Sequence, residues 1–171
     1  MKPTLYILCG LPYCGKSTLT RELVKRHKFE VCSVDNQIDK YKMDTDEMTQ
    51  DDWNLVYSEA YENLKKDLRA GKSVIFDMGH LKRSERNTAR AIAKDCGVNH
   101  KLVYINTPKE EIEKRWEENE TTKARGQLSR KGLDTAYGFW QEPQVDEDPI
   151  LYNNKMDLNS WIKKYITSDE N

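Results

Sequence analysis

The chain has 171 residues, of which 37% are hydrophobic and 33% charged, and its formal net charge at pH 7 is −1. This composition can bury a hydrophobic core, which predicts a single domain over residues 1–171. No apolar run approaches the roughly 20 residues of a membrane-spanning helix, so no membrane partner is expected. The four cysteines lack metal-ligand spacing and a dense disulfide pattern, which favours reduced thiols in a cytoplasmic protein.

The first element is a short apolar strand, predicted at residues 4–9, which runs directly into the motif Gly-x-x-x-x-Gly-Lys-Ser of residues 10–17. Glycines let successive backbone N–H groups surround an anion, and the helix that follows offers its unpaired N–H groups. Lys16 can reach the terminal phosphates, and the Ser17 hydroxyl can ligate Mg²⁺. The alternative is a glycine-containing turn that happens to precede a lysine.

The helix expected after this motif places Leu19, Leu23 and Val24 on one face, so the motif has the strand–loop–helix context that a phosphate-binding loop requires. The sequence therefore predicts binding of a nucleoside triphosphate. The predicted nucleotide-binding residues are Gly10, Leu11, Pro12, Tyr13, Cys14, Gly15, Lys16, Ser17, Thr18 and, near the C-terminus, Asn154.

Short apolar runs then alternate with longer helical patterns, which is typical of a parallel sheet covered by helices. Further strands are predicted at 29–35, 72–78, 100–106 and 149–153. The expected fold is a three-layer α/β fold with a parallel sheet of about five strands, helices on both faces and a basic lid.

Apolar spacing predicts one long helix over most of 45–69. Thr107 is expected to cap the helix 109–119, with Pro108 at its first position. Gly71 and Gly97 stand where helices should end, and residues 167–171 are predicted to form a frayed tail.

Two carboxylates follow predicted strands, Asp35 after the second and Asp77 after the third. Ligands of open parallel sheets bind beyond the carboxyl ends of the strands, and phosphoryl transfer needs a carboxylate for the acceptor hydroxyl and ligands for Mg²⁺. Asp35 and Asp77 can divide those roles, with Ser17 and Asp77 on the metal. The alternative is that each aspartate only caps the next helix.

A basic segment, residues 121–131, holds Lys123, Arg125, Arg130 and Lys131 without an acidic residue. It reads as part of a mobile lid over about 119–132 that closes over polyphosphate, where an arginine would neutralise charge on the transferring group. The alternative is an ordinary solvated loop.

The order of the phosphate loop, Asp35, the segment "VIFDMGHLKRSER", the basic lid and "FWQEPQVDEDP" resembles the P-loop kinases grouped with the kinase domain of polynucleotide kinase, zeta toxins and chloramphenicol phosphotransferase. The resemblance implies ATP-dependent transfer of the γ-phosphoryl group to a hydroxyl, with Asp35 as general base. It also implies that Lys16 and Ser17 serve phosphates and Mg²⁺, and that Arg125, or failing that Arg130, is the catalytic lid arginine.

Polynucleotide kinase carries an arginine for nucleic-acid phosphate three residues after its base, where this sequence has Ile38. Arg83 and Arg86 could contact an acceptor or lie on a solvated helix face.

A GTPase switch is the main alternative class, because residues 154–157 match the guanine-reading Asn-Lys-x-Asp element. That match falls after the basic lid, however. A kinase also suits it, because an asparagine in the turn before the last helix can lie close to the nucleotide base. A nucleotide-dependent interaction module without turnover is the third class.

The acceptor is expected to be a small hydroxylated molecule or a nucleoside, and a polynucleotide 5′-hydroxyl is the second choice. Acidic groups at residues 44–52 and 142–148 would repel a nucleic-acid backbone. No obligate protein partner is inferred.

Overall fold

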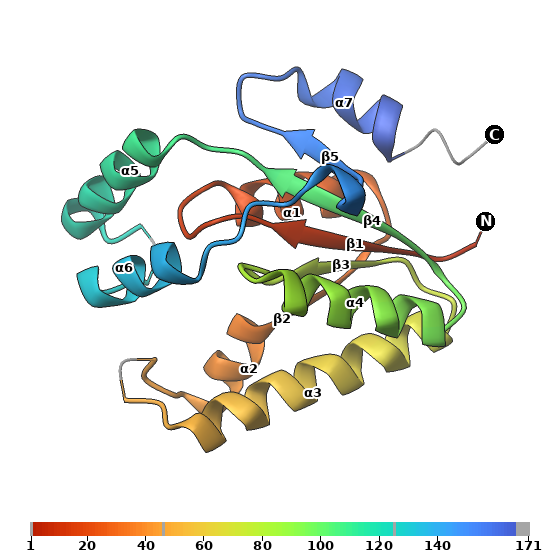
Figure 1. The fold of residues 1–171 in the computed structure, drawn as a ribbon, viewed down its shortest axis with the longest axis horizontal. Helices are drawn as coiled ribbons and strands as arrows, with labels where there is room; N and C mark the ends of the chain where they lie inside the picture. The colour runs from red at the N-terminus through yellow and green to blue at the C-terminus, as the bar shows by residue number, and fades with distance from the viewer. Residues whose placement is uncertain (1, 46, 125, 167–171) are drawn as a thin grey trace.

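The computed structural model describes residues 2–45, 47–124 and 126–166. It contains a five-stranded, wholly parallel sheet with the strand order β2-β3-β1-β4-β5 (Figure 1). The strands are β1 (Thr4–Cys9), β2 (Glu30–Ser33), β3 (Val74–Asp77), β4 (Asn99–Ile105) and β5 (Pro149–Tyr152). All five predicted strands are confirmed, and so is the α/β class.

Seven helices are described, together with one 3₁₀ turn, Val145–Glu147. The helices are α1 (Lys16–Arg26), α2 (Val34–Tyr41), α3 (Gln50–Arg69), α4 (Arg83–Asp95), α5 (Lys109–Thr122), α6 (Arg130–Phe139) and α7 (Leu158–Tyr165). In Figure 1, α5 and α6 extend past the carboxyl ends of β1 and β4. Among the described residues, we find no helix with the length and apolar character needed to cross a membrane.

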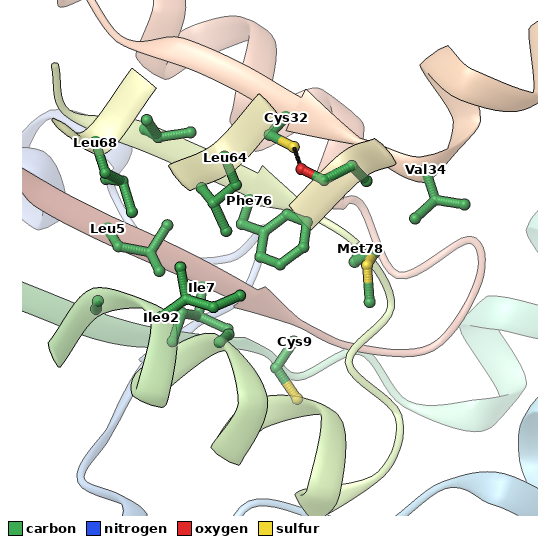
Figure 2. Packing of buried hydrophobic residues seen from close by; sticks show 14 of the residues in the cluster. Leu5, Ile7, Cys9, Cys32, Val34, Leu64, Leu68, Phe76, Met78 and Ile92 are labelled. Carbon is green, nitrogen blue, oxygen red and sulfur yellow. Dashed lines mark hydrogen bonds between the residues drawn. The ribbon is translucent and has the colours of Figure 1, made fainter. Parts of the chain in front are cut away.

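The sheet is buried on both faces, which explains why its strands are continuous apolar runs. Leu5 and Ile7 of β1 face α2, α3 and α4, whereas Tyr6 and Leu8 face the cluster that includes α1 and α7. Figure 2 shows the first cluster, in which Phe76 of β3 lies among side chains of α3 and α4. Each cluster lies between the sheet and the helices on one of its faces, so helices, sheet and helices form the three layers expected from the sequence.

The long helix predicted over most of 45–69 is confirmed as α3, and it begins at Gln50 because Thr49 forms a capping box with Asp52. The expected cap of α5 is wrong. Pro108, not Thr107, is the N-cap of α5, because the Thr107 hydroxyl donates to the carbonyl of Cys14 at 2.8 Å. Val24, expected on the buried face of α1, is 40% exposed.

The helix ends are predicted better than the starts. Gly71 and Gly97 directly follow the C-caps of α3 and α4 with φ of 81° and 67°, a left-handed conformation that suits glycine. The predicted frayed tail at 167–171 lies outside the described residues.

Arg86 is fully buried in α4, which contradicts both positions expected for it. Its Nε and Nη2 donate to the two carboxylate oxygens of Glu147, each at 2.8 Å, and Nη1 donates to the carbonyl of Gln141 at 2.9 Å. Arg90 adds a contact to Glu147 at 2.9 Å. This network fixes the segment after α6 against α4. The neighbouring Arg83 is exposed and pairs with Asp146.

The Glu147→Gln variant is expected to lower the free energy of unfolding by about 3–5 kcal/mol, because breaking a buried pair leaves Arg86 uncompensated. Hydrogen bonds from Arg86 hold the pKa of Glu147 at about 2, below its ordinary 4.5. The stabilisation is therefore present above pH 4.5 and is lost as the pH falls toward 2. Urea denaturation at pH 7 and pH 3 measures it. Asp146→Asn is the control and is expected to change stability little, because its ion pair with Arg83 is exposed and screened by solvent.

Candidate active site

The phosphate loop, residues 10–15, leaves β1 at the centre of the sheet and opens α1 at Lys16. Gly15 has φ of 110°, which a side chain would strain. A Cβ on Gly10 would lie 2.6 Å from the Sγ of Cys14 and 3.0 Å from the carbonyl oxygen of Ile105. Both motif glycines are therefore needed for the observed backbone.

Lys16 reaches back over the loop. Its Nζ donates to the carbonyls of Gly10 at 2.7 Å and Leu11 at 2.9 Å, and lies 3.6 Å from the Sγ of Cys14. The ammonium is thus held at the loop itself, the region in which the motif would gather phosphate oxygens. Backbone N–H groups at the start of α1 and this cation together suit a polyanion.

The loop is anchored from two sides. Behind it, the loop between β3 and α4 contributes the Gly79 carbonyl, which accepts from the Gly10 amide at 3.0 Å. His80 follows Gly79 and is buried, which lowers the pKa of its ring to about 4, so the ring is neutral at pH 7. Its Nδ1 donates to the Leu8 carbonyl at 2.6 Å. This histidine supports the backbone at the end of β1.

On the other side, Tyr13 ties the loop to α5 and to the lid. Arg115 of α5 donates through Nη1 to the Tyr13 carbonyl at 3.0 Å. The amide of Leu128, in the lid segment, donates to the Tyr13 hydroxyl at 3.2 Å, and the Trp116 indole donates to the Leu128 carbonyl at 2.7 Å. Sequence reasoning gave these contacts no role. Arg115 looks like a surface residue, since it also pairs with Glu111 one turn earlier.

The basic lid predicted at 119–132 comprises the end of α5, a connection and the start of α6. Arg125 lies outside the described residues. Arg130 is described and makes ion pairs with Glu113 and Asp134, and its guanidinium lies 5.6 Å from the centre of the Trp116 ring. These acidic partners hold Arg130 on the outer surface of α5 and α6.

The two predicted carboxylates lie near the carboxyl ends of neighbouring strands, Asp77 in β3 and Asp35 just after β2. Ser33 of β2 pairs with Asp77 of β3, so Asp35 lies two residues beyond this rung. Asp35 was expected at the end of the second strand. It lies instead in the first turn of α2, where it is exposed. Ser33 caps that helix by accepting from the Asn36 amide at 3.1 Å, so the role of helix cap is taken by another residue.

Asp77 lies against α1, where its Oδ2 accepts from the Thr20 hydroxyl at 2.9 Å. Ser17 is three residues before Thr20 and therefore shares its face of α1. Within the described parts of the chain, no group of three or more histidine, cysteine, aspartate or glutamate side chains forms a ready metal site. Mg²⁺ commonly takes only one or two protein ligands beside substrate phosphates, which the hydroxyl of Ser17 and the carboxylate of Asp77 can provide.

The segment that resembles a guanine-reading element forms the turn between β5 and α7. Asp157 caps α7 by accepting from the Ser160 amide at 2.9 Å, and Asn154 is exposed in the turn. The aspartate of the motif therefore has an ordinary structural use.

A family model described as an AAA domain matches residues 5–139. The chain belongs to this AAA-domain family. L-seryl-tRNA(Sec) kinase of Methanococcus maripaludis is 29% identical over 183 aligned residues, which cover 98% of this AAA-domain chain. The chain spans 66% of that relative's length, which is about two thirds.

Solved structures resemble this AAA-domain chain over nearly its full length. APS kinase CysC of Mycobacterium tuberculosis, in complex with AMPPNP and APS, has a TM-score of 0.70 at 19% identity and covers 99% of each chain. A putative kinase of Chloroflexus aurantiacus has a TM-score of 0.76 at 16% identity, with 98% of each chain covered. The prediction of a P-loop kinase family and fold is confirmed, and the relatives named here are kinases, as expected.

Proposed function

We propose that this protein is an ATP-dependent kinase that transfers the γ-phosphoryl group to a hydroxyl of a small molecule or nucleoside. The observation that carries the proposal is the phosphate loop with the Lys16 ammonium held against it, beside Asp77 at the end of β3 and Asp35 just after the neighbouring strand β2. Family membership and the bound AMPPNP of the similar APS kinase support nucleotide binding. The buried thiols of Cys9, Cys14 and Cys32 fit a cytoplasmic enzyme.

Each proposed role follows from position. Lys16 and the loop amides bind the ATP phosphates, and Ser17 with Asp77 would hold Mg²⁺, which neutralises charge between the β- and γ-phosphates. Asp35 is exposed and takes the proton of the acceptor hydroxyl. A bond forms between the acceptor oxygen and the γ-phosphorus, the bond from that phosphorus to the β–γ bridging oxygen breaks, and ADP leaves. Arg125 or Arg130 of the lid would stabilise the transferring group.

A hydroxyl on an amino acid joined to tRNA is the second candidate acceptor, favoured by the 29% identity to L-seryl-tRNA(Sec) kinase. A polynucleotide 5′-hydroxyl ranks lower because Ile38, at the position of a phosphate-contacting arginine, is buried against the core. A GTPase switch and an interaction module without turnover rank below these, since Asp157 is a helix cap and both strand-proximal carboxylates are present.

ADP release measured against a panel of nucleosides, sugars, aminoglycosides, amino alcohols and 5′-hydroxyl oligonucleotides tests the proposal. At least one hydroxyl acceptor is expected to raise ADP release above the rate with Mg·ATP alone, and ATP is expected to be preferred to GTP. A clear preference for GTP would favour the switch. Tight ATP binding with no acceptor-stimulated release would favour the interaction module.

A further inference from the structure

A cavity of about 330 Å³ adjoins the phosphate loop and plays no part in the roles assigned so far. Four parts of the chain form it: the loop, the end of β4, the start of α5, and the end of α6 with the residues that follow. The lining residues that matter here are Leu11, Cys14, Tyr104, Tyr137, Trp140 and Glu142. Its volume is at the low end for small-molecule sites, so it suits a small ligand or one group of a larger one.

Two aromatic rings and a carboxylate form one corner of this cavity. The rings of Tyr104 and Trp140 have centroids 5.7 Å apart and are tilted by 41°, so they form adjoining walls. The Tyr104 hydroxyl donates to Oε1 of Glu142 at 3.0 Å. Burial and this carboxylate raise the pKa of Tyr104, so the hydroxyl stays protonated and remains a donor. The carboxylate is thus held beside the aromatic corner.

The lining of the cavity carries one carboxylate, Glu142, and one ammonium, Lys109. Glu142 lines the cavity and is exposed, and it forms no ion pair with any described residue. Lys109 is the one basic residue of the lining, and its Nζ lies 4.6 Å from the centre of the Tyr137 ring. That contact shows an ammonium group on an aromatic face within the cavity, and it leaves the corner of Tyr104, Trp140 and Glu142 for a ligand.

The position of the cavity relates it to the phosphate loop. Leu11 and Cys14 belong both to its lining and to the phosphate loop, and Lys16 contacts both residues. A small molecule whose charged end lies in the aromatic corner can therefore present another group toward the phosphates. An anionic group would be repelled by Glu142, and an uncharged one would form no ion pair with this carboxylate.

We propose that this cavity binds the ammonium group of a small amino alcohol, whose hydroxyl is the phosphoryl acceptor. This inference rests on the proposed function, since it names the acceptor class of the same site. Trp140 and Tyr104 contact the ammonium through their ring faces, and Glu142 supplies the opposite charge. Specificity against sugars and other neutral alcohols comes from the carboxylate, with which they form no ion pair.

Binding is tested first, without nucleotide, by ligand-observed NMR titration of the full chain. The probes are ethanolamine and choline, and the matched neutral compound is N-acetylethanolamine. The cationic probes are expected to bind at least about tenfold more tightly. Glu142→Gln should remove about tenfold of that preference, and Trp140→Leu, which keeps an apolar side chain, should weaken the cations about three- to thirtyfold. Glu110→Gln, an exposed glutamate of α5 outside the cavity, should change nothing.

Equal binding of charged and neutral probes would overturn the inference, as would unchanged binding in Glu142→Gln. A loss of ATP affinity in Trp140→Leu would also overturn it, because the cavity would then hold the base of the nucleotide. ADP release separates the two proposals. Release stimulated equally by neutral alcohols keeps the kinase and rejects the amine site. Binding of the amines with no acceptor-stimulated release from any compound keeps the site and rejects the kinase.

Discussion

Lys16→Ala is expected to abolish detectable turnover and to weaken Mg·ATP binding about 10–100-fold. Its ammonium is held at the phosphate loop by two loop carbonyls, at 2.7 and 2.9 Å, so it is already in place for phosphate oxygens. A hydrogen bond to a charged group contributes about 1.5–3 kcal/mol, which corresponds to that change in affinity. Loss of a cation that stabilises transition-state charge lowers the rate by a further factor of about 10²–10³.

Nucleotide affinity is measured by titration calorimetry with Mg·ATP, and folding by far-UV circular dichroism. Lys25→Ala is the matched control, because Lys25 lies on the same helix but is exposed and pairs only with Glu22 among the described residues. Unchanged ATP affinity in a folded Lys16→Ala variant would remove the basis of the proposed function.

Asp35→Asn is expected to lower phosphoryl transfer by about 10²–10⁴-fold, the usual contribution of a general base, while ATP affinity changes little. The structure sharpens this test, because Ser33 and not Asp35 caps α2. Replacing an exposed first-turn aspartate with asparagine therefore leaves the cap intact. Single-turnover transfer from labelled ATP to an identified acceptor provides the measurement, and Asp39→Asn, exposed on the same helix, is the control.

Full activity in Asp35→Asn would show that the base is another group. Loss of ATP binding in that variant would mean that Asp35 and Asp77 have exchanged roles. Asp77→Asn should instead raise the Mg²⁺ concentration needed for half-maximal rate, because Asp77 is assigned to the metal. Thr20→Val removes the hydrogen bond to Asp77 without changing charge, so it separates loss of the carboxylate's charge from loss of its position.

The features that sequence predicted are those whose physical cause is local. The phosphate loop is contiguous, and a strand buried on both faces is apolar whatever its partners, so residues 4–9 and 10–17 could be assigned without coordinates. Glycine at the end of a helix is likewise a local requirement. Capping was less secure, because a hydroxyl such as that of Thr107 can serve a distant carbonyl instead.

The features that sequence could not predict depend on partners far along the chain. Arg86 and Glu147 are separated by 61 residues and are both charged, so each looks like a surface residue until the fold brings them together. Trp140, Tyr104 and Glu142 come from β4 and from the segment after α6, and nothing local marks them as one cavity. Asp35 and Asp77 are the exception. Both follow strands, and the fold class alone implies that the carboxyl ends of parallel strands lie at the same edge of the sheet.

Tyr13 couples the phosphate loop to the lid segment energetically. Its carbonyl accepts from Arg115 and its hydroxyl from the Leu128 amide, while its backbone has φ of 62°, a conformation that costs a non-glycine residue free energy. A ligand that favours one arrangement of this residue favours the matching arrangement of the lid. By reciprocity, whatever orders the lid raises affinity at the loop by the same factor. Under the proposed function, release of ADP and opening of the lid segment would then be coupled by the same free energy.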